Sequence, residues 1–266
     1  MFFERLAQKR RSVLFTWLIS YILVLLIPLI FSIIVYQKTE GIVNNEIYTA
    51  NEAVLKQVRQ TIDSRLEDIQ TLSTHIALNN NLKSFMNKKP PFQDSVYYQI
   101  YNTIQDFIIL RVLNNFIDSF YIYLKSTNTV LYYNQHVDSM IFYDAYCGSK
   151  NMTYKQWIYL LGRIHNKHYI STERKDNYGK YYKCLAYVQS LPIGEPHKAA
   201  ATLVVMVDER KLTEIIKNMQ WIKNGIGLIL DKDGHLVVST AKIDLPGILQ
   251  YCNFKAEWNG IRMAEW

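Results

Sequence analysis

The sequence predicts an α+β protein in which an N-terminal membrane helix continues into a long helix and then into an antiparallel sheet. Two observations predict the helices: an uncharged run of 24 residues, Val13–Tyr36, and an apolar stripe at helical spacing, Val54–Ile76. A third observation predicts the sheet: later in the sequence, several strand patterns follow one another as hairpins and pairs. Because strands and helices are segregated, we expect an antiparallel α+β sheet and not a doubly wound fold.

The run Val13–Tyr36 is long enough to cross a bilayer core of roughly 30 Å at about 1.5 Å per residue, so the lipid bilayer is the first predicted partner. Residues 1–12 carry a net charge of +3, whereas residues 37–40 balance to zero. This excess of basic charge predicts that residues 1–12 are cytoplasmic and that residues 37–266 are extracytoplasmic. A cleaved signal peptide is the alternative, but its apolar core is usually about 7–15 residues long.

A helical stripe follows the membrane run, and no proline or glycine interrupts residues 42–89. Spacings of three and four residues are typical of one apolar helix face. We predict one long helix from about Ile42 to about Ile76. It either packs on its own domain or acts as a stalk, which could pair with a second copy as a homodimer. The stripe consists of Val54, Val58, Ile62, Leu66, Ile69, Leu72 and Ile76.

Shorter elements follow the long helix. Thr153 and Asp208 are expected helix caps, and Asp233-Gly234 between two apolar runs is a strong hairpin signal. The expected helices cover residues 82–89, 92–110, 153–165 and a short segment after Asp208. The expected strands cover residues 116–125, 130–133, 180–190, 200–207, 226–230 and 236–239.

Composition narrows the functional classes. The formal net charge is +7 and the pI about 9.1, but the basic residues beyond the membrane run are dispersed, so no nucleic-acid contact is expected. Cys147, Cys184 and Cys252 form no CxxC pair. They are compatible with one disulfide and a free thiol, or with three unpaired thiols.

No catalytic motif is visible, so we expect neither catalytic residues nor a cofactor. His165 and His168 are three residues apart, but the second lies beyond the expected helix end. Asp231 and Asp233 resemble the start of a calcium loop, yet no glutamate stands at the twelfth position of such a loop. No metal site is therefore predicted.

Tyrosine is the compositional exception, because 16 of the 20 tyrosines fall between Tyr97 and Tyr187. Aromatic rings with a polar tip suit a pocket for small organic ligands. The alternative is that most of them cover a half-exposed sheet face. If a pocket exists, the central strands and the helix that crosses them should form it. The candidate ligand-binding residues are Tyr121, Tyr123, Trp157 and Tyr187.

Several segments together resemble the double Cache sensor domains of Gram-positive bacteria. They are the span SYILVLLIPLIFSIIVY, the helix ANEAVLKQVRQTIDSRLEDIQTLSTHIALN, the strand FIDSFYIYL, the strand-helix TLVVMVDERKLTEII and the hairpin GLILDKDGHLVVS. The first two look most like membrane-anchored AraC-type transcriptional regulators, and sensor histidine kinases are the close alternative.

The resemblance implies extracytoplasmic helices over residues 37–111, a PAS-like membrane-distal lobe over 112–220 and an incomplete membrane-proximal lobe over 221–266. A second membrane span and an output domain are missing, so the chain is expected to be a fragment or a truncated relative. The implied function is sensing of a small solute or of a solute-binding protein. A membrane-held protein-interaction module is the alternative from another class, and an extracellular enzyme lacks a catalytic constellation.

Overall fold

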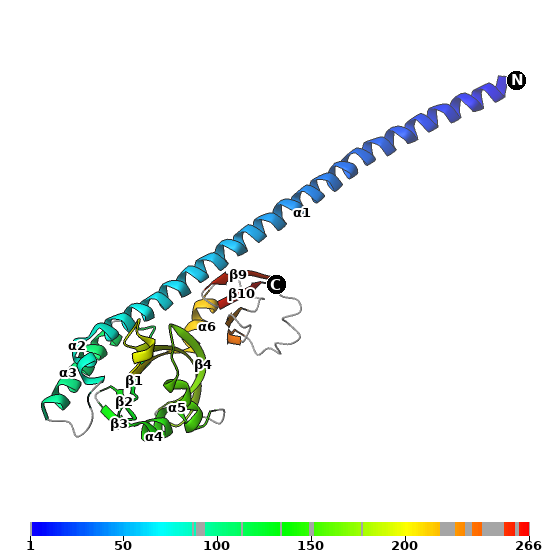
Figure 1. Cartoon of the computed structure of the whole chain (residues 1–266). Coiled ribbons are helices and arrows are strands. Elements are labelled where there is room, and N and C mark those ends of the chain that lie inside the picture. The colour runs from blue at the N-terminus through cyan, green and yellow to red at the C-terminus, as the bar shows by residue number, and fades with distance from the viewer. Residues whose placement is uncertain are drawn as a thin grey trace. The chain divides into compact units, whose positions relative to one another are not determined.

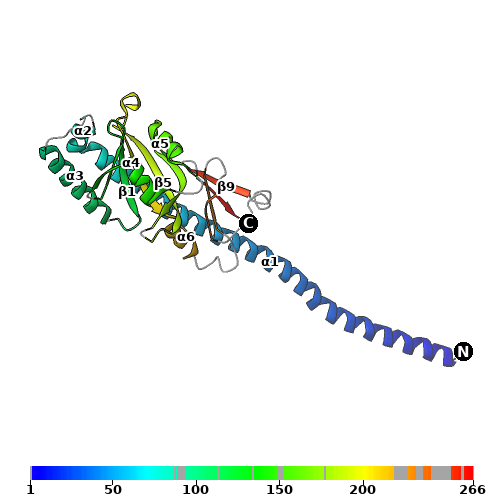
Figure 2. The same ribbon diagram turned by 90° about the horizontal axis from the view of Figure 1, so that it is seen from below.

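The computed structural model describes residues 2–86, 88, 94–112, 114–133, 135–148, 152–176, 178–218, 227–231, 236–240, 253–258 and 261–265. They fall into two units, Met1–Gln57 and Val58–Trp266. Figures 1 and 2 show the chain in two views related by a rotation of 90°.

Helix α1 runs without a break from Phe2 to Leu78, and its N-terminal part forms the first unit. The side chains of residues 15–36, most of the predicted membrane run, are all exposed. One 18-residue window of this helix has a mean hydropathy of 2.9 and no buried residue. By length and composition, α1 can therefore cross a membrane. Pro28 lies inside the helix without ending it, as membrane helices allow.

The second unit is built around a six-stranded antiparallel sheet with the strand order β3-β2-β1-β6-β5-β4. The predicted α+β class with an antiparallel sheet is thereby confirmed. The strands are β1 (Ser119–Leu124), β2 (Thr129–Tyr132), β3 (Gln135–Asp138), β4 (His168–Lys175), β5 (Tyr181–Leu191) and β6 (Ala201–Asp208).

Both faces of this sheet are covered by helices. One face packs against α1, α2 (Asn80–Met86), α3 (Asp94–Val112) and α6 (Glu209–Lys217). The other face packs against α4 (Ser139–Phe142), the π-helix η1 (Tyr143–Cys147) and α5 (Tyr154–Gly162). Figure 1 shows α4 and α5 beside the sheet, away from α2 and α3. Double coverage explains why β1 and β6 are buried along their whole length.

The apolar stripe of α1 packs on its own domain from Val58 onward. Each of its residues from Val58 to Ile76 is at most 6% exposed and belongs to the core between helix and sheet. Burial of one such side chain stabilises the fold by roughly 1.5–3 kcal/mol. The predicted packing of the helix on its domain is confirmed for this segment. Pairing of the helix with a second copy stays a prediction.

The two predicted helix caps are present. Thr153 and Gln156 form a reciprocal capping box at the start of α5. The Asp208 carboxylate accepts a hydrogen bond from the Arg210 backbone N–H at the start of α6. Asp208 is thus both the last residue of β6 and the N-cap of α6.

A second antiparallel sheet has the order β8-β7-β10-β9. The predicted hairpin strands are β7 (Leu228–Asp231) and β8 (Leu236–Ser239), and the Asp233-Gly234 turn lies outside the described residues. The pair β9 (Asn253–Trp258) and β10 (Ile261–Glu265) was not predicted. Ile229 and Val238 join the core that α1 and α6 share with the first sheet.

Three further elements were also missed: β3, the α4–η1 segment and β4. Strands β3 and β4 are the two edges of the six-stranded sheet. Most residues of both are polar or partly exposed, so neither shows the apolar alternation that identifies a half-buried strand.

Candidate ligand-binding site

Side-chain alternation divides the strands of the large sheet between its two faces. Tyr121 and Tyr123 of β1 and Tyr132 of β2 point to the side of α4, η1 and α5. Phe120 and Ile122 point to the side of α1. The face under α4, η1 and α5 is therefore aromatic, whereas the face under α1 is mainly aliphatic.

Trp157 is the centre of this aromatic cluster. The N-terminal capping box fixes α5 so that Trp157, one turn later, points down onto the sheet. Its indole Nε1 donates a hydrogen bond of 3.3 Å to the Tyr121 hydroxyl. Its ring centroid lies 6.1 Å from that of Tyr121 and 6.2 Å from that of Tyr123. Tyr143 of η1 and Phe142 of α4 add ring contacts to Trp157 at 5.6 and 6.1 Å.

A small cavity lies inside this cluster, between α5, η1 and strands β1, β4, β5 and β6. Its volume is about 20 Å³, enough for roughly one water molecule. A solute larger than water must therefore displace side chains to enter. The lining includes Tyr121, Cys147, Trp157, Leu161, Thr172 and Met206. The cover includes a π-helix, a distortion that is frequent at functional sites.

Arg174 of β4 places a buried charge on the same face. Its Nη1 donates to the Asp118 carboxylate at 3.0 Å and also to the Ser119 hydroxyl. Its Nη2 donates to the Tyr132 hydroxyl. The guanidinium carbon lies 5.4 Å from the ring centroid of Tyr132 and 5.8 Å from that of Tyr146. Arg174 thus ties an edge strand to the opposite half of the sheet through charged and aromatic contacts.

Further contacts link the Arg174–Asp118 pair to the start of α6. The Tyr182 hydroxyl donates to Asp118 at 3.2 Å, and the Arg210 guanidinium carbon lies 5.6 Å from the Tyr182 ring centroid. Arg210 in turn donates from Nη2 to the Asp208 cap at 2.5 Å. These groups all lie at one end of the sheet and lead from the aromatic face to the start of α6.

Burial keeps the other titratable groups of this face neutral. It raises the pKa of the Cys147 and Cys184 thiols and of the Tyr182 phenol to about 12. Burial alone would lower the pKa of Arg174, but Tyr132, Tyr182 and Asp118 outweigh it and raise that pKa. A thiol that stays protonated is neither a good nucleophile nor a metal ligand. Neither thiol is therefore activated for thiolate chemistry.

Three of the four predicted ligand-binding residues come together. Tyr121, Tyr123 and Trp157 are in ring contact. Tyr187 does not join them, and its expected placement was wrong. It points to the α1 face, where its ring lies 5.2 Å from that of Tyr169 and its hydroxyl donates to Gln189 at 3.3 Å.

Sequence reasoning missed Arg174 and Asp118. Arg174 was missed because β4 was not recognised as a strand. Within HYISTERK, Ile170, Thr172 and Arg174 share one strand face. That alternation was the available signal, although two of the three residues are polar. Asp118 was recognised only as part of a strand alternation, and its partner lies 56 positions away.

The other singled-out residues make structural contacts. Cys147 and Cys184 are buried free thiols, so no disulfide joins them, and Cys252 lies outside the described residues. His165 Nε2 lies 2.6 Å from the Leu160 carbonyl oxygen, and its ring centroid lies 6.1 Å from that of His168. Within the described part of the chain, no three His, Cys, Asp or Glu residues group so as to hold a metal ion.

Comparison with solved structures identifies the class of fold. The extracellular domain of the putative histidine kinase vpHK1S-Z8 aligns with a TM-score of 0.50 at 11% identity, over 83% of this chain and 92% of that domain. The chain thus shares the fold of that extracellular domain. No protein-family model and no curated protein matches the sequence.

One chemoreceptor domain and one periplasmic domain align with lower TM-scores. The ligand-binding domain of Campylobacter jejuni chemoreceptor Tlp3, in complex with L-norvaline, has a TM-score of 0.39 at 13% identity, over 71% of this chain and 67% of that one. The periplasmic domain of Vibrio cholerae LuxQ has a TM-score of 0.39 at 15% identity, over 78% of this chain and 94% of that one.

Proposed function

We propose that this chain is the membrane-anchored, extracytoplasmic sensory module of a bacterial signalling protein, and that it binds a small solute without converting it. The solute site is the face of the large sheet under α4, η1 and α5. The observation that carries the proposal is the small cavity that Tyr121 and Trp157 line together with mainly aliphatic side chains, on the same sheet face as the Arg174–Asp118 pair. The similarity of fold to an extracellular sensor domain supports it.

A buried ion pair is a weak stabiliser compared with a well-packed apolar core. Stability alone therefore gives little reason for Arg174 at the edge of an aromatic cluster. Ligand sites, in contrast, combine apolar and aromatic walls with a few fixed polar groups. The Tyr121 and Tyr132 hydroxyls and the Arg174 guanidinium are such groups on this face.

The N-terminal part of α1 serves as the anchor in this proposal. Residues 13–36 span the bilayer, residues 1–12 remain cytoplasmic, and residues 37–266 lie outside the cell membrane. The basic residues before the span support this orientation. A solute shifts the signalling state only if it binds two arrangements of the module with different affinity.

Two alternatives remain for the signalling output of such a protein. An AraC-type transcriptional regulator was the leading interpretation of the sequence, and a sensor histidine kinase was the second. The structure that aligns with a TM-score of 0.50 is described as the extracellular domain of a putative histidine kinase, which supports the kinase alternative. The double Cache assignment and the lobe boundaries at residues 112–220 and 221–266 belong to the same proposal.

The test is a thermal-shift screen of the full chain in detergent micelles against sugars, amino acids and organic acids. A bound solute raises Tm with its concentration. Tyr121→Phe keeps the packing but removes a hydroxyl that can contact the solute and that accepts the Trp157 hydrogen bond of the closed cluster. The affinity for the hit should therefore change by about two- to tenfold. Tyr159→Ala is the control, because this exposed tyrosine lies on the same helix as Trp157 but outside the cluster.

Two results would contradict the proposal. The first is that no compound class stabilises the wild-type chain. The second is that a stabilising compound binds Tyr121→Phe and Tyr159→Ala equally well, because the compound then binds elsewhere on the molecule.

A further inference from the structure

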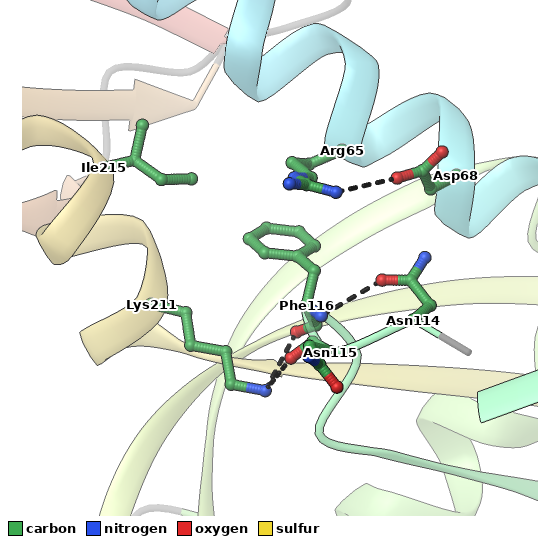
Figure 3. Close-up of a pocket in the computed structure, with 7 residues that line it drawn as sticks. All are labelled: Arg65, Asp68, Asn114, Asn115, Phe116, Lys211 and Ile215. Carbon is green, nitrogen blue, oxygen red and sulfur yellow. Dashed lines mark hydrogen bonds and ion pairs between the residues drawn. The ribbon is translucent and has the colours of Figure 1, made fainter. Parts of the chain in front are cut away.

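A second hollow lies on the other side of the large sheet. It has a volume of about 470 Å³ and is formed by α1, the segment before β1 and α6. This volume is within the range of about 300–1,000 Å³ found for small-molecule sites. Figure 3 shows its lining residues: Arg65, Asp68, Asn114, Asn115, Phe116, Lys211 and Ile215.

Two cations from helices far apart in the sequence line this hollow. Arg65 belongs to α1 and Lys211 to α6, and Figure 3 shows them around Phe116. Asp68 is the single carboxylate in the lining. The formal charge of the lining is therefore +1.

Both cations can donate further hydrogen bonds beyond those they make to the described residues. Arg65 reaches Asp68 through Nη1 at 3.4 Å, and both side chains are more than 40% exposed. Such an exposed pair contributes little stability. Lys211 Nζ donates to the carbonyl oxygens of Asn115 at 2.5 Å and Phe116 at 3.3 Å, and among the described residues it has no carboxylate partner.

The other polar groups add donors. Asn114 uses its side-chain oxygen to accept from the Phe116 backbone N–H at 3.0 Å, which leaves its NH₂ group for another partner. Arg65 adds a planar fork of N–H donors, which suits carboxylate and phosphate oxygens. The buried Phe116 and the partly buried Ile215 supply apolar wall. The hollow is donor-rich, positively charged and partly apolar.

We propose that this hollow binds a small organic oxyanion, a soluble carboxylate or phosphate ester, between Arg65 and Lys211. The ligand would join the domain-packed part of α1 to α6. The site lies on the α1 face of the sheet, whereas the aromatic cavity lies on the opposite face. It therefore does not depend on the solute site proposed above, and each proposal can fail without the other.

The test is isothermal titration of the full chain in non-ionic detergent with citrate and with glucose 6-phosphate at constant ionic strength. Glucose is the uncharged control. We expect saturable binding of at least one anion and none of glucose. Arg65→Gln and Lys211→Gln should each weaken binding at least fivefold. Asp68→Asn should strengthen it at least twofold, because it removes the one negative charge from the lining.

Lys217→Gln is the matched control for Lys211→Gln, because it makes the same charge change on an exposed residue of the same helix. It should leave the affinity within twofold. Arg65 is half-exposed, so Arg65→Gln tests the site even if Lys211→Gln impairs folding. Absence of saturable binding to both anions, unchanged affinity in Arg65→Gln, or weaker binding in Asp68→Asn would each overturn the proposal.

Discussion

The pair of Arg174 and Asp118 should behave as one energetic unit, and its two single variants should not cost the same. Asp118→Asn leaves the guanidinium without a counter-charge, and the Arg174 side chain is only 8% exposed. Breaking a fully buried pair costs about 3–5 kcal/mol. Asp118 is 28% exposed, so water reaches the pair, and we expect a smaller loss of about 2–3 kcal/mol.

Arg174→Met should cost less than Asp118→Asn. It leaves a carboxylate that water can partly solvate, and methionine packs well against the Tyr132 and Tyr146 rings. The loss then comes from the hydrogen bonds to Ser119 and Tyr132, worth about 1 kcal/mol each. The double variant should be more stable than Asp118→Asn alone, because no buried charge remains.

The assay is urea denaturation of the full chain in non-ionic detergent, followed by near-ultraviolet circular dichroism. The free energies of unfolding of the four proteins form a double-mutant cycle, and we expect a coupling energy of at least about 1 kcal/mol. The coupling should persist at high salt, because a mostly buried pair is weakly screened. Single costs that add to within about 0.5 kcal/mol would refute the reasoning.

Two further predictions concern His165 and Gly227. Burial lowers the pKa of the His165 imidazole. The hydrogen bond to the Leu160 backbone raises this pKa, and the charges of His168, Arg163 and Lys125 lower it further. Its folded pKa lies below the unfolded value of about 6.5, so the stability that it contributes is present above that pH and is lost as the pH falls. His165→Gln should therefore flatten the acid side of a stability–pH curve, and an unchanged slope would contradict this. In Gly227→Ala the new methyl group would overlap Ile216 Cγ2 of α6. Since Ile216 is buried and branched at Cβ, we expect a loss of about 1–3 kcal/mol in urea denaturation, whereas Gly162→Ala, with open space around it, should cost far less.

The parts of the fold that sequence predicts are those with a strong period. The α1 stripe repeats over about six turns. The buried strand ATLVVMV has Thr202 as its one polar residue. Edge strands β3 and β4 consist mostly of polar or partly exposed residues, so period-two reasoning has little to detect. The cap residues Thr153 and Asp208 were predictable because their chemistry is local.

The candidate site could be predicted only in part, because it depends on which strand face meets which layer of helices. In the observed register, Tyr187 lies opposite Val205, and Val205 lies opposite Phe120. Paired residues in a sheet point to the same side, so Tyr187 shares the α1 face with Phe120. Tyr121 instead lies opposite Val204 and faces Trp157. The residues of one strand do not by themselves predict which distant strand it pairs with, or in which register.

The small volume of the aromatic cavity has a consequence for how a solute would bind. A cavity of about 20 Å³ cannot hold even a small amino acid or sugar, so the binding-competent state must differ from the state described here. Opening must break the Trp157–Tyr121 hydrogen bond or separate α5 from the sheet. The apparent affinity is then the intrinsic affinity reduced by the fraction of molecules that are open. A solute that binds with micromolar affinity would make contacts worth more than the roughly 8 kcal/mol that this affinity represents. The difference is the free energy that the closed aromatic cluster holds against opening.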